Sequence, residues 1–136
     1  MSFGSLAVVE EWLEAANHGD GFRLEQLTHE EIEILGPRGH GRTDRRILSE
    51  WLTRAGFSAV PLRWFCGADG TVVVEQDARW VDVATGVEQG RARVASQFLV
   101  EEARVAKYVR HDKGLGPALA ASGLRDTDEV IERETP

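Results

Sequence analysis

Hydrophobic residues in the first third of the chain recur at three- and four-residue steps, the spacing of a helix face. In residues 5–18 this stripe consists of Leu6, Val9, Leu13 and Ala16, with Trp12 at its side. Asp20 is suited to cap a short second helix that contains Leu24 and Leu27. Thr43 is suited to cap a third helix, which Gly56 ends. A short strand over 31–35 and a glycine-rich loop over 36–41 are expected between the second and third helices.

After Gly56 the apolar residues alternate with polar ones, as in strands with one buried face. Turn signals at 69–70, 85–86 and 102–104 divide this part into strands over 60–66, 72–81, 87–100 and 104–112. Pro61 suggests an edge position or a bulge in the first of them. The side chains expected on the inner face are Val60, Leu62, Trp64 and Cys66; Val72, Val74, Gln76, Ala78 and Trp80; and Ala92, Val94, Ser96, Phe98 and Val100.

The opposite face of the same strands is charged. It carries Arg63, Glu75, Asp77, Arg79, Arg91, Arg93 and Gln97. Opposed charges on neighbouring strands can stabilise a solvated sheet or form a polar dimer interface. A last short helix is expected over 115–122, and residues 125–136 are a charged tail. The tail is expected to fray, with a partner-binding arm as the alternative.

Helices gathered early in the chain must cover one face of the sheet that the later hairpins form. The expected fold class is therefore α+β: a strongly curved, mostly antiparallel sheet wrapped around the N-terminal helices, forming a conical pocket. Residues 1–124 are expected to form one domain, because 136 residues suit a single core.

Composition narrows the classes of partner and site. The net charge of −7 comes without a basic stripe, which argues against nucleic acid. No apolar run is long enough to span a membrane and no secretory signal is visible, so a cytoplasmic location is expected. Cys66 is the only cysteine, and with His29, His40 and His111 it shows no metal-ligand spacing. We expect no metal and no cofactor.

Four segments carry a resemblance to a known superfamily. They are residues 12–20 (Trp-Leu-Glu-Ala-Ala-Asn-His-Gly-Asp), the strand from Ile32 to Pro37, the Gly41-Arg42 pair, and the hairpin from Phe98 to Asp112. Over residues 5–124 the chain resembles the nuclear transport factor 2-like superfamily, in particular its SnoaL-like branch of cone-shaped domains. The resemblance implies the conical fold and, because sheet-to-sheet homodimers are common in the superfamily, a homodimer. It does not imply one function, since members include ketosteroid isomerase, polyketide cyclases, epoxide hydrolases, dehydratases and pure binding domains.

The isomerase mechanism fits this sequence poorly. Its catalytic base position falls at Gly36, its tyrosine position at Trp12 and its second aspartate position at Ser96. None of these residues supplies the carboxylate base, the phenol or the protonated carboxyl group that the mechanism needs. Isomerisation by that route is therefore not expected.

The candidate ligand-binding residues are the inner-face aromatic and polar side chains. They are Trp12, Trp64, Gln76, Trp80, Ser96, Phe98 and Tyr108. Plain core packing is the alternative for the tryptophans, and it suits Trp51 better than the other three. For Ser96 the alternative is a bond to a neighbouring strand or a buried water. His111 and Asp112 are the acid–base candidates at the end of the last strand, with a salt-bridged strand end as the alternative. They are adjacent in a strand, so both cannot face the interior.

The function predicted from the sequence is the binding of a hydrophobic small molecule in a pocket between sheet and helices. One alternative is a cofactor-independent isomerase, cyclase, dehydratase or hydrolase that uses His111 or Asp112 as its acid–base group. Another is a structural dimer whose four tryptophans fill the core. His40, in the glycine loop, could lie at the pocket entrance or simply be solvated.

Overall fold

The structure is a computed structural model that describes residues 3–36, 39–54 and 56–130. For residues 3, 36, 39, 40, 51–54 and 57 it describes the backbone alone. The elements are, in order, α1 (Phe3–Asn17), α2 (Gly21–Gln26), β1 (Thr28–Gly36), β2 (Gly39–Asp44), α3 (Arg45–Arg54), β3 (Phe57–Cys66), β4 (Thr71–Val81), β5 (Glu88–Glu101), β6 (Arg104–His111), α4 (Leu115–Ser122) and the 3-10 turn η1 (Asp126–Asp128).

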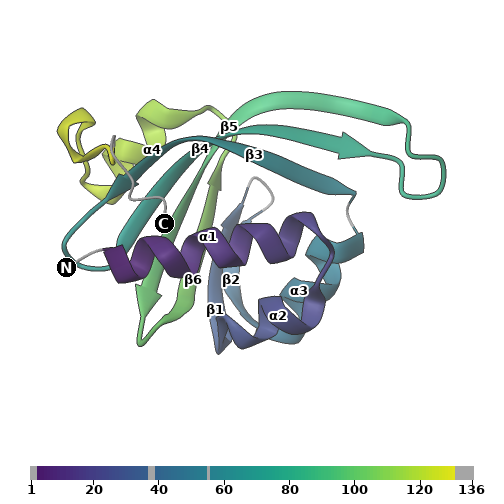
Figure 1. Ribbon diagram of the computed structural model, residues 1–136, viewed down its shortest axis with the longest axis horizontal. Coiled ribbons are helices and arrows are strands. Elements are labelled where there is room, and N and C mark those ends of the chain that lie inside the picture. Colours follow the sequence, from purple (N-terminus) through teal and green to yellow (C-terminus); the bar gives the residue numbers. More distant parts are fainter. Residues whose placement is uncertain (1–2, 37–38, 55, 131–136) are drawn as a thin grey trace.

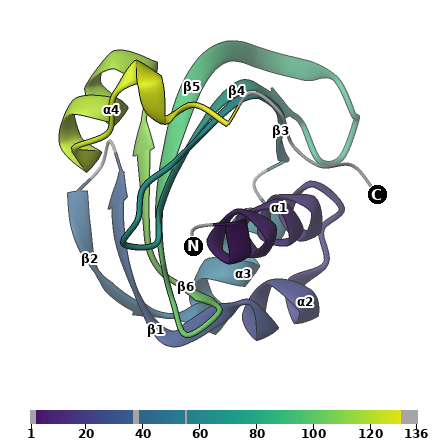
Figure 2. The same cartoon turned by 60° about the vertical axis from the view of Figure 1, so that its left-hand side comes forward.

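The six strands form one sheet in the order β2-β1-β6-β5-β4-β3. Neighbouring strands are antiparallel except β1 and β6, which are parallel. The sheet curls around α1, which lies along its concave side (Figures 1 and 2). The predicted α+β fold with a strongly curved, mostly antiparallel sheet is confirmed.

The side chains expected on the inner face of β3 are wrong in the first half of the strand. The pairing of β3 with β4 shifts register between Pro61 and Arg63, so β3 carries one extra residue there. Such a bulge breaks the alternation, so the residues before it face the opposite way from what the residues after it would predict. Ala59, rather than Val60, therefore faces inward opposite Ala78, and Val60 is 62% exposed on the outside. Leu62 also lies exposed in the bulge, whereas Trp64 and Cys66 regain the inner face.

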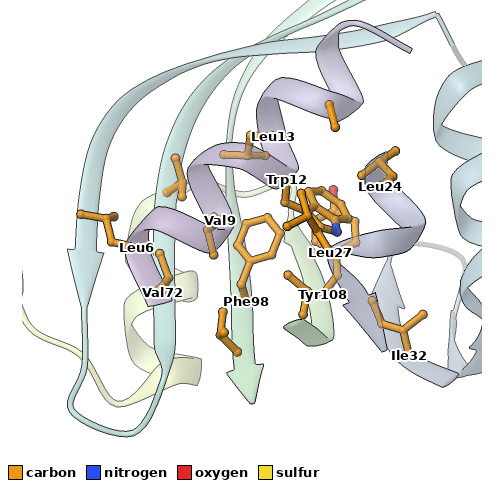
Figure 3. Packing of buried hydrophobic residues seen from close by; sticks show 14 of the residues in the cluster. Leu6, Val9, Trp12, Leu13, Leu24, Leu27, Ile32, Val72, Phe98 and Tyr108 are labelled. Carbon is orange, nitrogen blue, oxygen red and sulfur yellow. The ribbon is translucent and has the colours of Figure 1, made fainter. Parts of the chain in front are cut away.

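The stripe of α1 packs on the concave face and forms the main core (Figure 3). Val9, Trp12 and Leu13 contribute from the helix, and Phe98 and Tyr108 rise from β5 and β6 to meet them. The indole Nε1 of Trp12 donates to Oγ1 of Thr28 at 3.0 Å, which fixes α1 to the start of β1. The helix stripe and the inner-face alternation of β5 therefore meet as the sequence predicts.

The convex face has a second, smaller core that the sequence analysis missed. Phe65, Val73 and Ala95 point outward from β3, β4 and β5, and Ala118 and Leu119 of α4 cover them. The core is thus not confined to one side of the sheet. The charged outer face begins where this cover ends, with Arg91 beside Asp77 at 3.5 Å and Arg79 beside Glu88 at 3.0 Å.

The glycine-rich loop is shorter than expected, because residues 39–44 form strand β2 against β1. The cap of α3 is also one residue later than expected. Asp44, not Thr43, accepts a hydrogen bond from the backbone N–H of Arg46, at 2.8 Å. An aspartate at this position also places negative charge at the positive end of the helix dipole.

The start of the charged tail does not fray. Arg63 holds both carboxylate oxygens of Glu129, with Nε at 3.0 Å and an Nη at 2.8 Å. The backbone N–H of Val130 donates to the carbonyl of Trp64 at 2.8 Å, and Phe65 forms a β-bridge with Glu129. Glu129 and Val130 therefore pair with the edge of β3, after the turn η1, while residues 131–136 lie outside the described part. A domain boundary at residue 124 stays a prediction.

Candidate functional site

Three of the predicted ligand-binding residues form an aromatic cluster at the centre of the core. The ring centroids of Trp12 and Phe98 lie 5.1 Å apart, and each ring lies 5.3 Å from that of Tyr108. All three side chains are buried (Figure 3). Rings at these separations contact one another directly. Trp12, Phe98 and Tyr108 therefore pack against each other, and the confirmed inward orientation of Tyr108 serves this packing.

Gln76 and Ser96, the two polar side chains predicted on the inner face, are buried and bonded to each other. Ser96 donates from Oγ to Oε1 of Gln76 at 2.6 Å. Burial raises the pKa of the Tyr108 phenol, against the lowering effects of a hydrogen bond with Ser96 and of the positive charge of Arg110. A bond between neighbouring strands, one of the explanations considered for Ser96, is thus present, and Tyr108 adjoins it.

Trp64 and Cys66 lie on the inner face of β3, beside the docked tail. Trp64 is buried in the main core, and Cys66 is half-buried against it together with Val130. Burial raises the pKa of the Cys66 thiol to about 11. A thiol that stays protonated is a poor nucleophile, so Cys66 acts as a small residue of the inner face rather than as a reactive thiol.

The two acid–base candidates face opposite sides of the sheet, as adjacent strand residues must. His111 lies on the convex side, where its Nε2 is 2.9 Å from Oε1 of the outward-facing Gln97. Burial lowers the pKa of His111. Asp112 binds Arg110, with Oδ1 at 2.8 Å from Nε. His111 therefore points away from the inside of the cone, whereas Asp112, bound to the inward-facing Arg110, lies nearer the concave face.

One end of the concave face is not covered by the main core. Strand β6 ends at His111, opposite Ala95, while β5 and β4 continue as a hairpin past it (Figure 1). Beyond that point Ala92 faces inward beside Ala78 and is exposed, and Trp80 is half-buried. Arg110 reaches this region from β6, with its guanidinium carbon 5.8 Å from the centre of the Trp80 ring. We call the group Trp80, Gly90, Ala92, Arg110 and Asp112 the step site.

Sequence reasoning found Trp80 and Asp112 but missed Arg110 as a functional candidate. The sequence did indicate its orientation, because Arg110 comes two residues after Tyr108 on β6 and therefore faces the same side of the sheet. What the sequence did not give is that β6 stops while β5 continues. That difference in length is what opens the inner face at Ala92.

A separate surface groove of about 210 Å³ lies where α1 meets α2. It is lined by Glu11, Glu14, Ala15, His18, Asp20 and Arg23. Its charged groups already serve the helices, since Arg23 pairs with Glu11 at 3.1 Å and Asp20 caps α2. The groove is therefore explained by local structure.

Within the described residues, no cluster of histidine, cysteine and carboxylate side chains is arranged to hold a metal ion. None of the helices in this part of the chain has the length and apolar character needed to cross a bilayer. The side chains of Trp51 and His40 lie outside the described part, so the roles considered for them stay predictions.

Comparison with known proteins gives structural matches only. No family model matches the sequence, and no curated protein matches it. An NTF2-like protein from Cytophaga hutchinsonii superposes with a TM-score of 0.68 at 15% identity, covering 85% of this chain and 94% of that one. A protein of ketosteroid isomerase-like fold from Catenulispora acidiphila, in complex with trimethylamine, gives 0.64 at 17% identity, covering 87% and 93%.

A third match is TerC, co-crystallised with polyporic acid, with a TM-score of 0.66 at 12% identity, covering 88% of this chain and 97% of that one. At such identities the likeness concerns the course of the backbone and not the site. Together with the curled sheet around α1, these matches show that the chain has the fold of NTF2-like and ketosteroid isomerase-like proteins.

Proposed function

We propose that this protein binds a small, mostly apolar molecule at the step site. The observation that carries the proposal is the uncovered inner face of the β4–β5 hairpin, where the exposed Ala92 lies beside Trp80 and Arg110. Ligand sites typically combine an apolar surface with a few polar groups that orient the ligand. The centre of the cone is less suitable, because Trp12, Phe98 and Tyr108 occupy it.

The likeness to known structures supports the proposal in general terms. The Catenulispora protein is in complex with trimethylamine, and TerC was co-crystallised with polyporic acid. A domain with this fold can therefore hold a small molecule. We extend this property to the present chain. We also propose a cytoplasmic location, because a reducing compartment suits a chain whose single cysteine is free.

The test is native mass spectrometry of the protein from its own source, looking for a retained small molecule. Ala92→Trp places a large side chain in the step site and should abolish retention. Ala121→Trp adds the same side chain on the exposed surface of α4 and should leave retention unchanged. Retention by the Ala92→Trp protein would place the ligand elsewhere.

The enzyme alternative narrows to one residue. Asp112 is the acid–base candidate that belongs to the step site, where it binds Arg110. If the retained molecule is converted by the protein, Asp112→Ala should reduce turnover and His111→Ala should not. Unchanged turnover in both variants would remove these residues from the mechanism.

We also propose that two copies associate through the uncovered part of the outer face. Helix α4 covers one part of that face, so the partner copy would meet the charged part around Asp77, Arg79 and Arg91. The exposed Val60 adds apolar surface there. Val60→Asp should then yield a monomer in sedimentation velocity, whereas Ala121→Asp on α4 should not. A dimer that survives Val60→Asp would refute this placement.

A further inference from the structure

The strongest candidate feature is an arginine on the inner face whose side chain is mostly buried. The Arg110 side chain is only 18% exposed, although arginine is rarely buried. It lies opposite Ser96 on β5, and its charge opposes the rise that burial causes in the pKa of the inward-facing Tyr108. The positive charge of Arg110 is therefore directed into the concave side of the sheet.

Arg110 and Trp80 reach toward each other over β5. Arg110 is paired with Ser96, and Trp80 with Gly90, six positions away on the same strand. That separation is about 20 Å along an extended strand. The guanidinium carbon nevertheless lies 5.8 Å from the Trp80 ring. Both side chains must therefore lean over the inner face of β5, where Ala92 lies between their bases.

The counterion of Arg110 is more exposed than Arg110 itself. Asp112 is 42% exposed and approaches Nε at 2.8 Å and an Nη at 3.4 Å. A partly buried guanidinium requires an anion beside it, because an uncompensated charge is costly away from water. An exposed carboxylate, in contrast, loses little when it turns back to solvent. Another carboxylate can therefore take the place of Asp112 at low cost.

We propose that the ligand of the step site is a small aromatic carboxylate. Its carboxylate replaces that of Asp112 on Arg110, since the planar fork of arginine matches a carboxylate with two parallel hydrogen bonds. Its ring lies on the apolar surface of Trp80 and Ala92. This inference rests on the proposed function, because it assigns a chemical class to the ligand of the same site.

The experiment compares two probes of equal shape. 2-Naphthoate carries the carboxylate, and 2-naphthamide is its neutral counterpart; binding of each is measured by isothermal titration calorimetry. One charge-assisted hydrogen bond predicts that naphthoate binds at least about tenfold more tightly. Arg110→Met should reduce this ratio to about one. Arg42→Met removes an equal charge from the exposed pair with Glu31 and should leave the ratio unchanged.

A gain in binding gives the sharpest outcome. Asp112→Asn removes the competing carboxylate, so naphthoate should bind about two- to fivefold more tightly, while binding of naphthamide stays the same. A damaged fold cannot produce that result. The inference is overturned if both probes bind the native protein equally, if neither binds, or if Asp112→Asn leaves the ratio unchanged. If both probes bind equally, or if a neutral molecule is retained from the source, the protein still binds a small molecule as proposed, but the ligand is not an aromatic carboxylate.

Discussion

Substitution of Phe98 by alanine decides whether the centre of the cone is packed core or ligand pocket. Phe98 is 0% exposed and contacts the rings of Trp12 and Tyr108. Truncating a packed phenylalanine costs about 3–5 kcal/mol, because the lost contacts and the remaining cavity both count. If Phe98 lined an open pocket, the same change would merely widen the pocket and cost much less. We expect the larger value.

Urea unfolding followed by tryptophan fluorescence measures the difference. With a denaturant slope of about 2 kcal/mol per molar for a chain of this size, the midpoint should fall by about 1.5–2.5 M. That loss is a large part of the about 5–15 kcal/mol that stabilises a typical domain. Val83→Ala, at a site that is 67% exposed, is the control and should change stability by less than about 0.5 kcal/mol. A loss below about 1 kcal/mol for Phe98→Ala would refute the packed core.

Three further predictions test the bulge, the docked tail and the thiol. In thermal melts, Ala59→Asp should be far more destabilising than Val60→Asp, because the first buries an unpaired charge in the core whereas residue 60 of the single chain is 62% exposed; equal losses would contradict the bulge. The bond with Arg63 lowers the pKa of Glu129, so its stabilising effect should be present above pH 4.5, the ordinary value. It should fade as pH drops through the lowered pKa, and urea unfolding of Glu129→Gln should lack this loss. At pH 8 a Cys66 pKa of about 11 instead of 9.0 leaves about a hundredfold less thiolate, so iodoacetamide should react about a hundredfold more slowly than with the unfolded chain.

The sequence predicted those parts of the fold in which a simple period continues without interruption. The alternation along β5 places Val94, Ser96 and Phe98 on the inner face, as the structure does. The stripe of α1 likewise identified Val9 and Leu13 as core residues. In both elements the spacing of the apolar residues is regular, so it predicts correctly which side chains face the core.

The errors arose where the period is broken or where an element meets a distant one. Pro61 signalled a bulge, but the pattern alone did not show that the bulge turns Val60 outward. The outward apolar residues Phe65 and Val73 were passed over because the rest of their face is charged. Their partner, α4, comes about fifty residues later in the chain, and no local pattern reveals that contact.

The position of the candidate site follows from where β6 ends. On the inner face of β5, Phe98 is held in the core by Tyr108 of β6, whereas Ala92, beyond the end of β6, has no such cover. The same strand therefore supplies a packed residue and an open one on one face. Arg110 lies at the boundary, two residues beyond Tyr108, and its charge would be costly in the core but is tolerated where Asp112 and solvent reach it. A longer β6 would cover Ala92 and close the step site, so the strand end is what separates the part of the cone that stabilises the fold from the part proposed to bind.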